Sequence, residues 1–134
     1  MNTGHLQRRW SAVRPQVYDK ETRIVSLDIK EETQTDEQGE EQQGYSFLPV
    51  ETDGQMDYGH IKSQLIEAGF AQKDEFGLVI NAVEGILEAA AGATTWAKFK
   101  ETLAAQDGIT EFADFCAFRK ECAAAAKEAM ETIK

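Results

Sequence analysis

The chain has 134 residues, of which 42% are hydrophobic and 28% charged, and its formal net charge is −10. This length suits a single domain, and the composition is typical of a folded globular protein rather than of a disordered chain. We therefore expect one domain over residues 1–134, large enough to fold without disulfides or metals.

The charge is unevenly distributed along the chain. Residues 1–23 hold five basic and two acidic side chains, a net charge of +3, whereas residues 28–57 hold ten carboxylates and one lysine. An acidic surface repels phosphate groups, so we expect no nucleic-acid binding except through the basic amino-terminal arm.

The cysteines and the apolar segments indicate the compartment. Cys116 and Cys122 are six residues apart in a predicted helix, where they point to different faces, so we expect two reduced thiols. The first residues lack the apolar run of a signal peptide, and the least charged stretch, 78–97, still contains polar and acidic side chains. These features favour a cytoplasmic protein that does not enter a membrane.

Residues 1–14 show no clear period and are predicted to be a flexible basic arm, unless Trp10 and Val13 find an apolar partner. Residues 15–53 are predicted to form a β meander. Residues 23–30 alternate between apolar and polar side chains, as in a half-buried strand, and residues 45–50 form a second extended run. The two runs are predicted to pair as a hairpin, with Val17–Tyr18 as a candidate third strand.

Two details complete the predicted hairpin. The polar, acidic segment 31–44 between the runs is predicted to be a solvated connection centred on residues 36–39. Pro49 cannot donate a hydrogen bond to a neighbouring strand, so the last strand is predicted to be an edge or to end there.

Residues 54–134 are predicted to form about four helices. Asp57 caps the first helix and Gly69 closes it. Asp74 opens the second, whose apolar residues recur at helical spacing and are predicted to face the core: Phe76, Val79, Ile80, Val83, Ile86, Leu87 and Ala90. Thr94 or Thr95 caps the third, which ends at Gly108 and carries Leu103 and the aromatic residues Trp96 and Phe99, which are predicted to pack in the core. Thr110 caps the fourth, whose apolar and small residues are Phe112, Phe115, Cys116, Cys122, Ala123, Ala126, Met130 and Ile133.

A small sheet needs a cover on one face, and amphipathic helices need an apolar surface to cover. The predicted fold class is therefore α+β, with an N-terminal two- or three-stranded antiparallel meander followed by a C-terminal helical half.

The sequence offers no pattern of a catalytic, metal or cofactor site. The carboxylates cluster in the predicted loop 31–41. A loose, solvated loop does not provide the shielded cleft that acid–base catalysis needs. His5 and His60 are isolated from residues spaced as metal ligands, and the glycines form no phosphate-binding loop. We therefore predict that the chain is not an enzyme and has no cofactor. Cofactor-free hydrolysis by carboxylates paired in a deep apolar pocket is the remaining enzymatic alternative.

Three stretches carry a resemblance to known proteins: 17–28, 58–76, and 112–120 with 126–128. In the order of these parts the chain resembles small uncharacterised phage and prophage proteins encoded near tail genes of gut anaerobes. Residues 89–109 look like a helix that those shorter relatives lack. The resemblance implies a phage-derived accessory or structural protein, located in a host cytoplasm or in a virion.

The leading hypothesis is a non-enzymatic interaction or assembly module, connected with a phage tail, that binds a protein partner or a second copy of itself. A sheet edge or a helical face would make the contact. An exposed Phe118 would indicate such a partner surface. The candidate partner-binding residues are Tyr45, Phe47 and Leu48 on the strand and Phe118 and Arg119 on the last helix. The alternative is an acidic decoy that imitates nucleic acid and inhibits a nucleic-acid-binding host protein.

Overall fold

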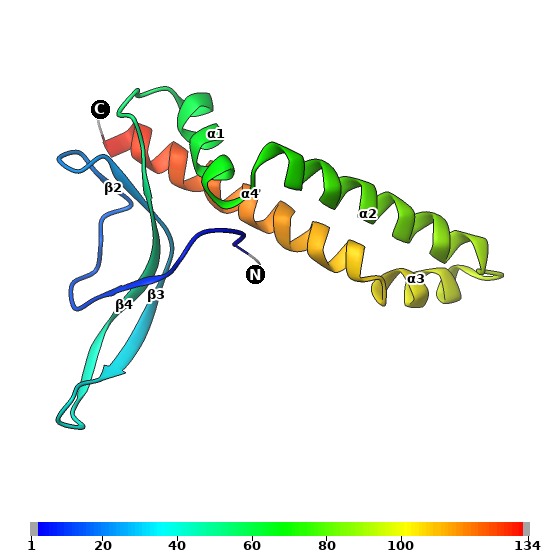
Figure 1. The fold of residues 1–134 in the computed structure, drawn as a ribbon, viewed down its shortest axis with the longest axis horizontal. Helices are drawn as coiled ribbons and strands as arrows, with labels where there is room; N and C mark the ends of the chain where they lie inside the picture. Colours follow the sequence, from blue (N-terminus) through cyan, green and yellow to red (C-terminus); the bar gives the residue numbers. More distant parts are fainter. Residues whose placement is uncertain (1–2, 133–134) are drawn as a thin grey trace.

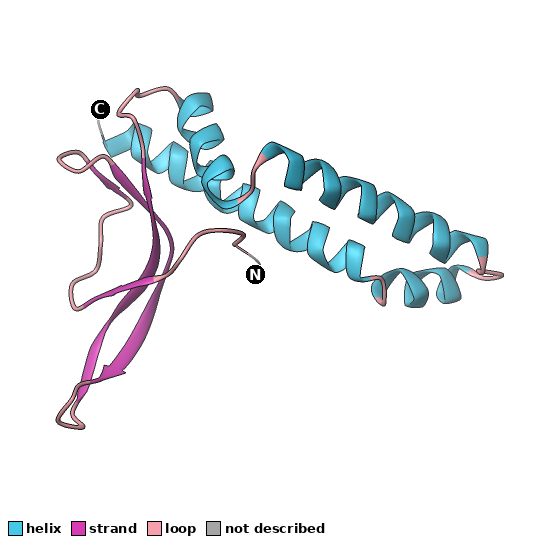
Figure 2. Ribbon diagram, viewed as in Figure 1, coloured by secondary structure: helices cyan, strands magenta, loops and turns pink. Residues whose placement is uncertain are grey.

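The structure is a computed structural model that describes residues 3–132, apart from the side chains of Gln72 and Lys73. Over this range the chain forms a four-stranded antiparallel sheet followed by four helices (Figures 1 and 2). The predicted α+β class and its order of parts are confirmed. Ile133, assigned above to the last helix, lies outside the described residues.

The sheet has the strand order β1-β4-β3-β2. The bounds of the strands are β1 Arg9–Ser11, β2 Tyr18–Asp19, β3 Ile24–Thr35 and β4 Glu41–Glu51. β3 and β4 form the predicted hairpin, and β2 is the candidate third strand. The fourth strand, β1, lies within the segment that was predicted to be a flexible arm, and it pairs with Tyr45–Phe47 of β4.

The β3–β4 hairpin is longer than the sequence predicted. The prediction of a loop over 31–44 is wrong, because β3 continues to Thr35 and β4 begins at Glu41. The turn is held by Asp36, whose side chain accepts hydrogen bonds from the backbone N–H groups of Gln38 and Glu40. The outer half of the hairpin projects from the body and is exposed on both faces (Figure 1), so its strands lack the apolar alternation by which a half-buried strand is recognised.

Trp10 and Gly44 fit together where β1 joins the sheet. The Trp10 indole N–H donates to the carbonyl oxygen of Glu32 at 2.9 Å, and a Cβ atom at Gly44 would lie 2.4 Å from the indole ring. Because glycine has no side chain, Gly44 leaves room for the Trp10 ring to lie across β4. Trp10 is thus held by a backbone carbonyl oxygen and a glycine rather than by the apolar partner that the sequence analysis required, and Val13 stays exposed.

The position of Pro49 was predicted only in part. β4 does not end at Pro49, because it continues to Glu51. It is also not an edge strand along its whole length, because it lies between β1 and β3. β1 covers only Tyr45–Phe47, however, so Pro49 lies on a part of β4 beyond the end of β1. The sequence did not predict β1, because its three residues are too few to show an alternation of apolar and polar side chains.

Four helices follow the sheet within the described residues: α1 Tyr58–Gly69, α2 Gln72–Ala91, α3 Trp96–Ala104 and α4 Asp107–Thr132. Asp57 caps α1 as predicted, since its side chain accepts a hydrogen bond from His60 N at 3.0 Å. Thr95 caps α3 in the same way. The predicted bounds of α2, α3 and α4 were wrong by two to four residues, as is usual for helix ends.

The main core lies between the sheet, α1 and the carboxyl-terminal half of α4. Val25, Leu27, Leu48 and Val50 of the sheet are buried against the two helices. Three phenylalanines pack where α4 passes the end of α1: the ring centroids of Phe70 and Phe115 are 4.9 Å apart, and those of Phe70 and Phe118 are 5.3 Å apart. Of the small residues that the sequence analysis named for α4, Cys122 and Ala126 are buried here, together with Ala125 and Ala129.

Beyond this core, α2 and the first half of α4 form a helical hairpin that projects away from the sheet, with α3 at its far end (Figure 1). Small residues allow the helices to approach closely. A Cβ atom at Gly85 of α2 would lie 3.2 Å from Gln106, and one at Gly108 of α4 would lie 2.5 Å from the carbonyl oxygen of Asn81. Ala82 and Ala89, on the same face of α2 as Gly85, are buried.

Replacement of Gly44 by alanine tests the attachment of β1. The added methyl group overlaps the Trp10 ring, so we expect Gly44→Ala to lower the free energy of unfolding by about 1–3 kcal/mol and to shift the tryptophan fluorescence as the ring moves into solvent. Gly77→Ala on α2 is the matched control. Its methyl group meets no atom within 4 Å, so the change should stabilise the protein by about 0.5–1 kcal/mol. Equal effects of the two changes in urea unfolding would contradict this account.

Candidate functional site

A row of large apolar side chains lies exposed along α2. Phe76 is 68% exposed, Val83 47% and Leu87 64%, and the side chains between them are also solvent-accessible. The prediction that this face of α2 lies in the core is therefore wrong. We call the row the α2 stripe: Phe76, Val79, Ile80, Val83, Ile86, Leu87 and Ala90.

The stripe is exposed because α2 packs against α4 through a different face. Leu78, Ala82, Gly85 and Ala89 follow one another at intervals of three and four residues, and Gly85 contacts the start of α4. Since each residue of a helix is rotated by about 100° from the last, the centres of this face and of the stripe are about 130° apart around the axis. The period correctly predicted an amphipathic helix, but a period cannot tell which of two apolar faces the rest of the chain covers.

The aromatic residues of α3 are also poorly covered. Trp96 is 69% exposed, so its predicted place in the core is wrong, and its ring stacks on Phe99 with the centroids 5.6 Å apart. Lys100 lies over the Trp96 ring, 5.7 Å from its centroid. The far end of the helical hairpin therefore presents further apolar surface.

The sequence-predicted partner residues do not form one surface. Phe47 and Leu48 are buried in the sheet, and only Tyr45 keeps part of its side chain accessible. Arg119 is held by Glu75, with 2.8 Å between Nη1 and Oε1, and its guanidinium lies over the Phe115 ring. Whether these residues bind a partner stays a prediction.

Phe118 is 0% exposed, so it cannot mark a surface site. The sequence argument placed it opposite Phe115, but residues three apart share one side of a helix, and both rings pack on Phe70. The side chain also lies against Gly69, where an added Cβ atom would be 2.7 Å from the ring.

The acidic residues of the hairpin stand on strands rather than in a loop. Glu31 is opposite Tyr45, Glu32 is opposite Gly44, and Glu41 is opposite Thr35 in the β3–β4 register. Neighbouring residues of a strand point to opposite faces, so Glu31 and Glu32 lie on different sides of the sheet. The nearby surface hollow is open and polar, and is lined by Ala12, Glu31, Glu32, Thr33, Gln43, Gly44 and Tyr45.

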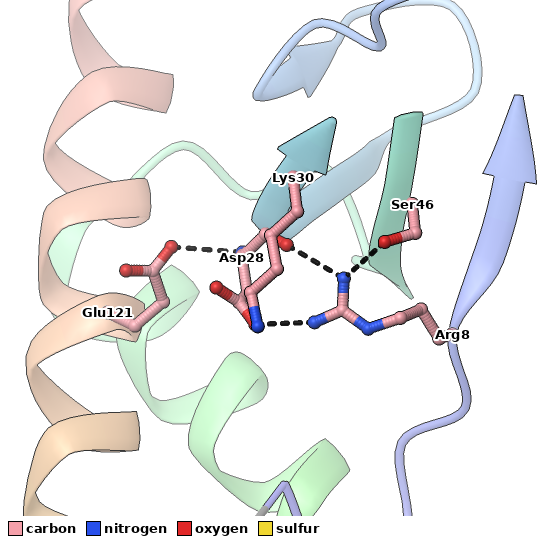
Figure 3. A network of polar contacts seen from close by, with 5 residues as sticks. All are labelled: Arg8, Asp28, Lys30, Ser46 and Glu121. Atoms are coloured by element: carbon pink, nitrogen blue, oxygen red, sulfur yellow. Dashed lines mark hydrogen bonds and ion pairs between the residues drawn. The ribbon is translucent and has the colours of Figure 1, made fainter. Parts of the chain in front are cut away.

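A polar network joins the sheet to α4 (Figure 3). Arg8 donates from Nη1 to the carbonyl oxygen of Asp28 at 3.0 Å and to Ser46 Oγ at 2.9 Å, and its Nη2 pairs with the Asp28 carboxylate. The backbone N–H of Asp28 donates to Glu121 Oε1 at 3.0 Å. Asp28 has a φ of +48° at the register shift between Leu27 and Lys30. These contacts all converge on the bulge, so the network fixes the backbone rather than forming an empty site.

Neither histidine lies in a metal-binding group. His60 Nε2 is 2.6 Å from Asp53 Oδ2, and the pKa of Asp53 is lowered first by a hydrogen bond from the backbone of Gln55 and then by His60. His5 Nε2 lies 3.5 Å from Asp74 Oδ2. Over the described residues, no cluster of three or more His, Cys, Asp or Glu side chains is arranged to hold a metal ion.

Comparison with protein-family models, with curated proteins and with solved structures found no significant match. The helices of residues 3–132 include none that is long and apolar enough to cross a bilayer.

The two cysteines should differ in reactivity. Cys122 is 0% exposed, and burial, with a smaller contribution from Glu121, raises the pKa of its thiol to about 12. Because the thiolate is the reactive form, Cys122 should resist alkylation in the folded protein at pH 8, while the partly exposed Cys116 reacts. Mass spectrometry after iodoacetamide treatment should show one modified site in the native protein and two in urea. Rapid native modification of Cys122 in a Cys116→Ser variant would contradict the burial.

Proposed function

We propose that the protein is a non-enzymatic interaction or assembly module and that the α2 stripe is its contact surface. The observation that supports the proposal is the exposure of six large apolar side chains in one row on a regular helix. Water-exposed apolar residues scattered singly are ordinary, whereas a contiguous row on one face is typical of a binding surface.

The size of the stripe supports a specific contact. From the exposed fractions of its side chains, the accessible apolar area is on the order of 600 Å², the upper end of the largest patch found on a typical monomer. Removing such an area from water is the main driving force of association. Residues on a helix also hold their side chains in fixed relative positions, so a partner would meet a preformed surface.

The setting of this module is part of the proposal. The resemblance to proteins encoded near phage tail genes suggests an accessory role in tail assembly, in a host cytoplasm or in a virion. That setting rests on the sequence resemblance, and the contact surface rests on the α2 geometry, so the two can be tested separately.

Co-purification tests the contact surface. A tagged copy should be co-expressed with an untagged copy in host cells that carry the phage genes, and the bound chains identified by mass spectrometry. We expect the wild-type protein to retain an untagged copy or another defined chain, and the double variant Ile80→Glu/Leu87→Glu to lose it, because two charges would be buried in an apolar contact.

The matched control changes two charges on the solvent face of the same helix, at the exposed Glu84 and Glu88, as Glu84→Lys/Glu88→Lys. This control should retain the bound chain. If the stripe variant keeps every chain that the wild type retains, the stripe is not the contact surface and the proposal fails.

A second candidate function, the acidic decoy, is favoured by one observation. Carboxylates on strands are held more rigidly than carboxylates in a loop, and rigid spacing is what imitation of phosphates requires. The order of residues along β3 weakens the decoy hypothesis. Glu31 is followed on its own face by Thr33 and Thr35, so the carboxylates do not form a continuous row. We therefore rank it second.

Neutralising the hairpin tests the decoy. Six changes to glutamine or asparagine remove its charges without altering side-chain shape: Glu31→Gln, Glu32→Gln, Asp36→Asn, Glu37→Gln, Glu40→Gln and Glu41→Gln. A decoy should lose its inhibition of a nucleic-acid-binding host protein, measured by competition with labelled DNA. Unchanged competition, or none by the wild type, would remove this candidate.

A further inference from the structure

We infer that the partner of the α2 stripe is the α2 stripe of a second copy of this chain, with the two helices antiparallel. The inference rests on the proposed function, and it names the partner of the same surface. Three observations support it: the order of side-chain sizes along the stripe, the area of the stripe, and the position of the acidic β3–β4 hairpin at one end of the molecule.

The stripe has the spacing of a helix that packs along another helix. Phe76, Val83 and Ala90 are seven residues apart, and Val79 and Ile86 occupy the intermediate positions. A repeat of this kind keeps one seam facing a neighbouring helix over several turns when the two helices coil slightly around each other. Ile80 and Leu87 broaden the seam on one side, as in helices of bundles.

The sizes of the side chains match in the antiparallel direction. With Val83 on the two-fold axis, Phe76 lies opposite Ala90 of the other copy, so the largest side chain of the stripe meets the smallest. In the same register Val79 meets Ile86 on one side of the seam, and Ile80 meets Leu87 on the other. A parallel pairing in register would instead place Phe76 against Phe76 and leave a gap between the two Ala90 residues, and such uneven layers pack poorly.

The area is also sufficient for a dimer. Stable interfaces bury about 800 Å² on each partner, and the stripe alone offers about 600 Å² of apolar surface on each copy. Polar side chains at its margins would supply the rest as a rim. The third face of α2, which includes Asn81, Glu84 and Glu88, remains exposed to water in this arrangement.

Charge favours the antiparallel direction as well. The acidic β3–β4 hairpin lies at the sheet end of the molecule, away from the tip formed by α2 and α3 (Figure 1). Antiparallel helices place the two acidic hairpins at opposite ends of the dimer, separated by at least the length of α2, about 30 Å. This is several Debye lengths at physiological salt, so their repulsion is screened. Parallel helices would place both at the same end.

Sedimentation velocity tests the dimer. The wild-type protein should sediment as a dimer at micromolar concentration. Val83→Glu brings two like charges together on the two-fold axis and should raise the dissociation constant by about 100-fold or more. Glu88→Lys changes a charge on the solvent face of the same helix and should leave the dissociation constant unchanged.

A charge-reversal pair distinguishes a lost contact from a lost fold. Val83→Glu and Val83→Lys should each be monomeric with unchanged circular dichroism. An equal mixture of the two variants should restore a dimer, because the introduced carboxylate and the introduced ammonium group then face each other across the axis. A mixture that stays monomeric would place Val83 away from the axis and overturn this register.

Disulfide trapping tests the direction, in a Cys116→Ser background that removes the partly exposed native thiol. Antiparallel pairing places residue 79 opposite residue 86, so Val79→Cys and Ile86→Cys should each cross-link poorly alone and efficiently when mixed. Efficient cross-linking of each variant with itself would show parallel helices and overturn the antiparallel arrangement.

The outcomes separate this inference from the proposed function. A wild-type protein that stays monomeric at high-micromolar concentration overturns the self-pairing. If the Ile80→Glu/Leu87→Glu variant nevertheless loses a different defined partner in the co-purification, the stripe remains a contact surface and only the identity of its partner was wrong.

Discussion

The arrangement of the whole molecule depends on the contact between α4 and the end of α1. Phe70 lies between Phe115 and Phe118, and Gly69 leaves space for the Phe118 ring. Because α4 is continuous through this contact, its carboxyl-terminal half covers the sheet while its first half extends beyond the sheet to carry α2 and α3. The same three aromatic rings therefore close the core and fix the direction in which the helical hairpin projects.

The division of side chains on α2 follows from this geometry. A hairpin of two long helices has no third layer to bury large side chains, so its internal contact is made by Ala82, Gly85 and Ala89, which let the two backbones approach closely. Small residues stabilise the hairpin through dense packing but remove little apolar area from water. The larger area lies on the stripe, and its burial would add the third layer that the hairpin lacks. An interaction through the stripe would therefore stabilise the hairpin as well as hold the partner.

The features that depend on neighbouring residues could be predicted from the sequence. The features that depend on contacts between distant segments of the chain could not. The caps Asp57 and Thr95, the helical period of α2 and the β3–β4 pairing all arise from local chemistry and were predicted. Strand β1 is stabilised by the fit of Trp10 over Gly44, thirty-four residues later in the chain, and no local period indicates such a contact. The stripe was recognised as apolar, but its assignment to the core assumed that the chain covers every apolar face it has. The sizes of the residues on the two faces were the signal that could have distinguished them.

The two projecting parts of the molecule have opposite surfaces, and this contrast bears on how it associates. An exposed strand offers unpaired backbone groups to any other strand, and proteins protect such edges with charged side chains and short flanking strands. The outer half of β3–β4 is polar on both faces and carries Glu31, Glu32 and Glu41, and the short β1 covers the edge of β4 at the base of this half, along Tyr45–Phe47. These features disfavour strand addition, which the sequence alone had suggested as a mode of binding. Within a helix such as α2 the backbone groups pair along the helix itself, and α2 is apolar along the stripe. In the proposed assembly, association is thereby directed away from the sheet, where it would be poorly specified in register, and toward a helix whose side chains would define both register and direction.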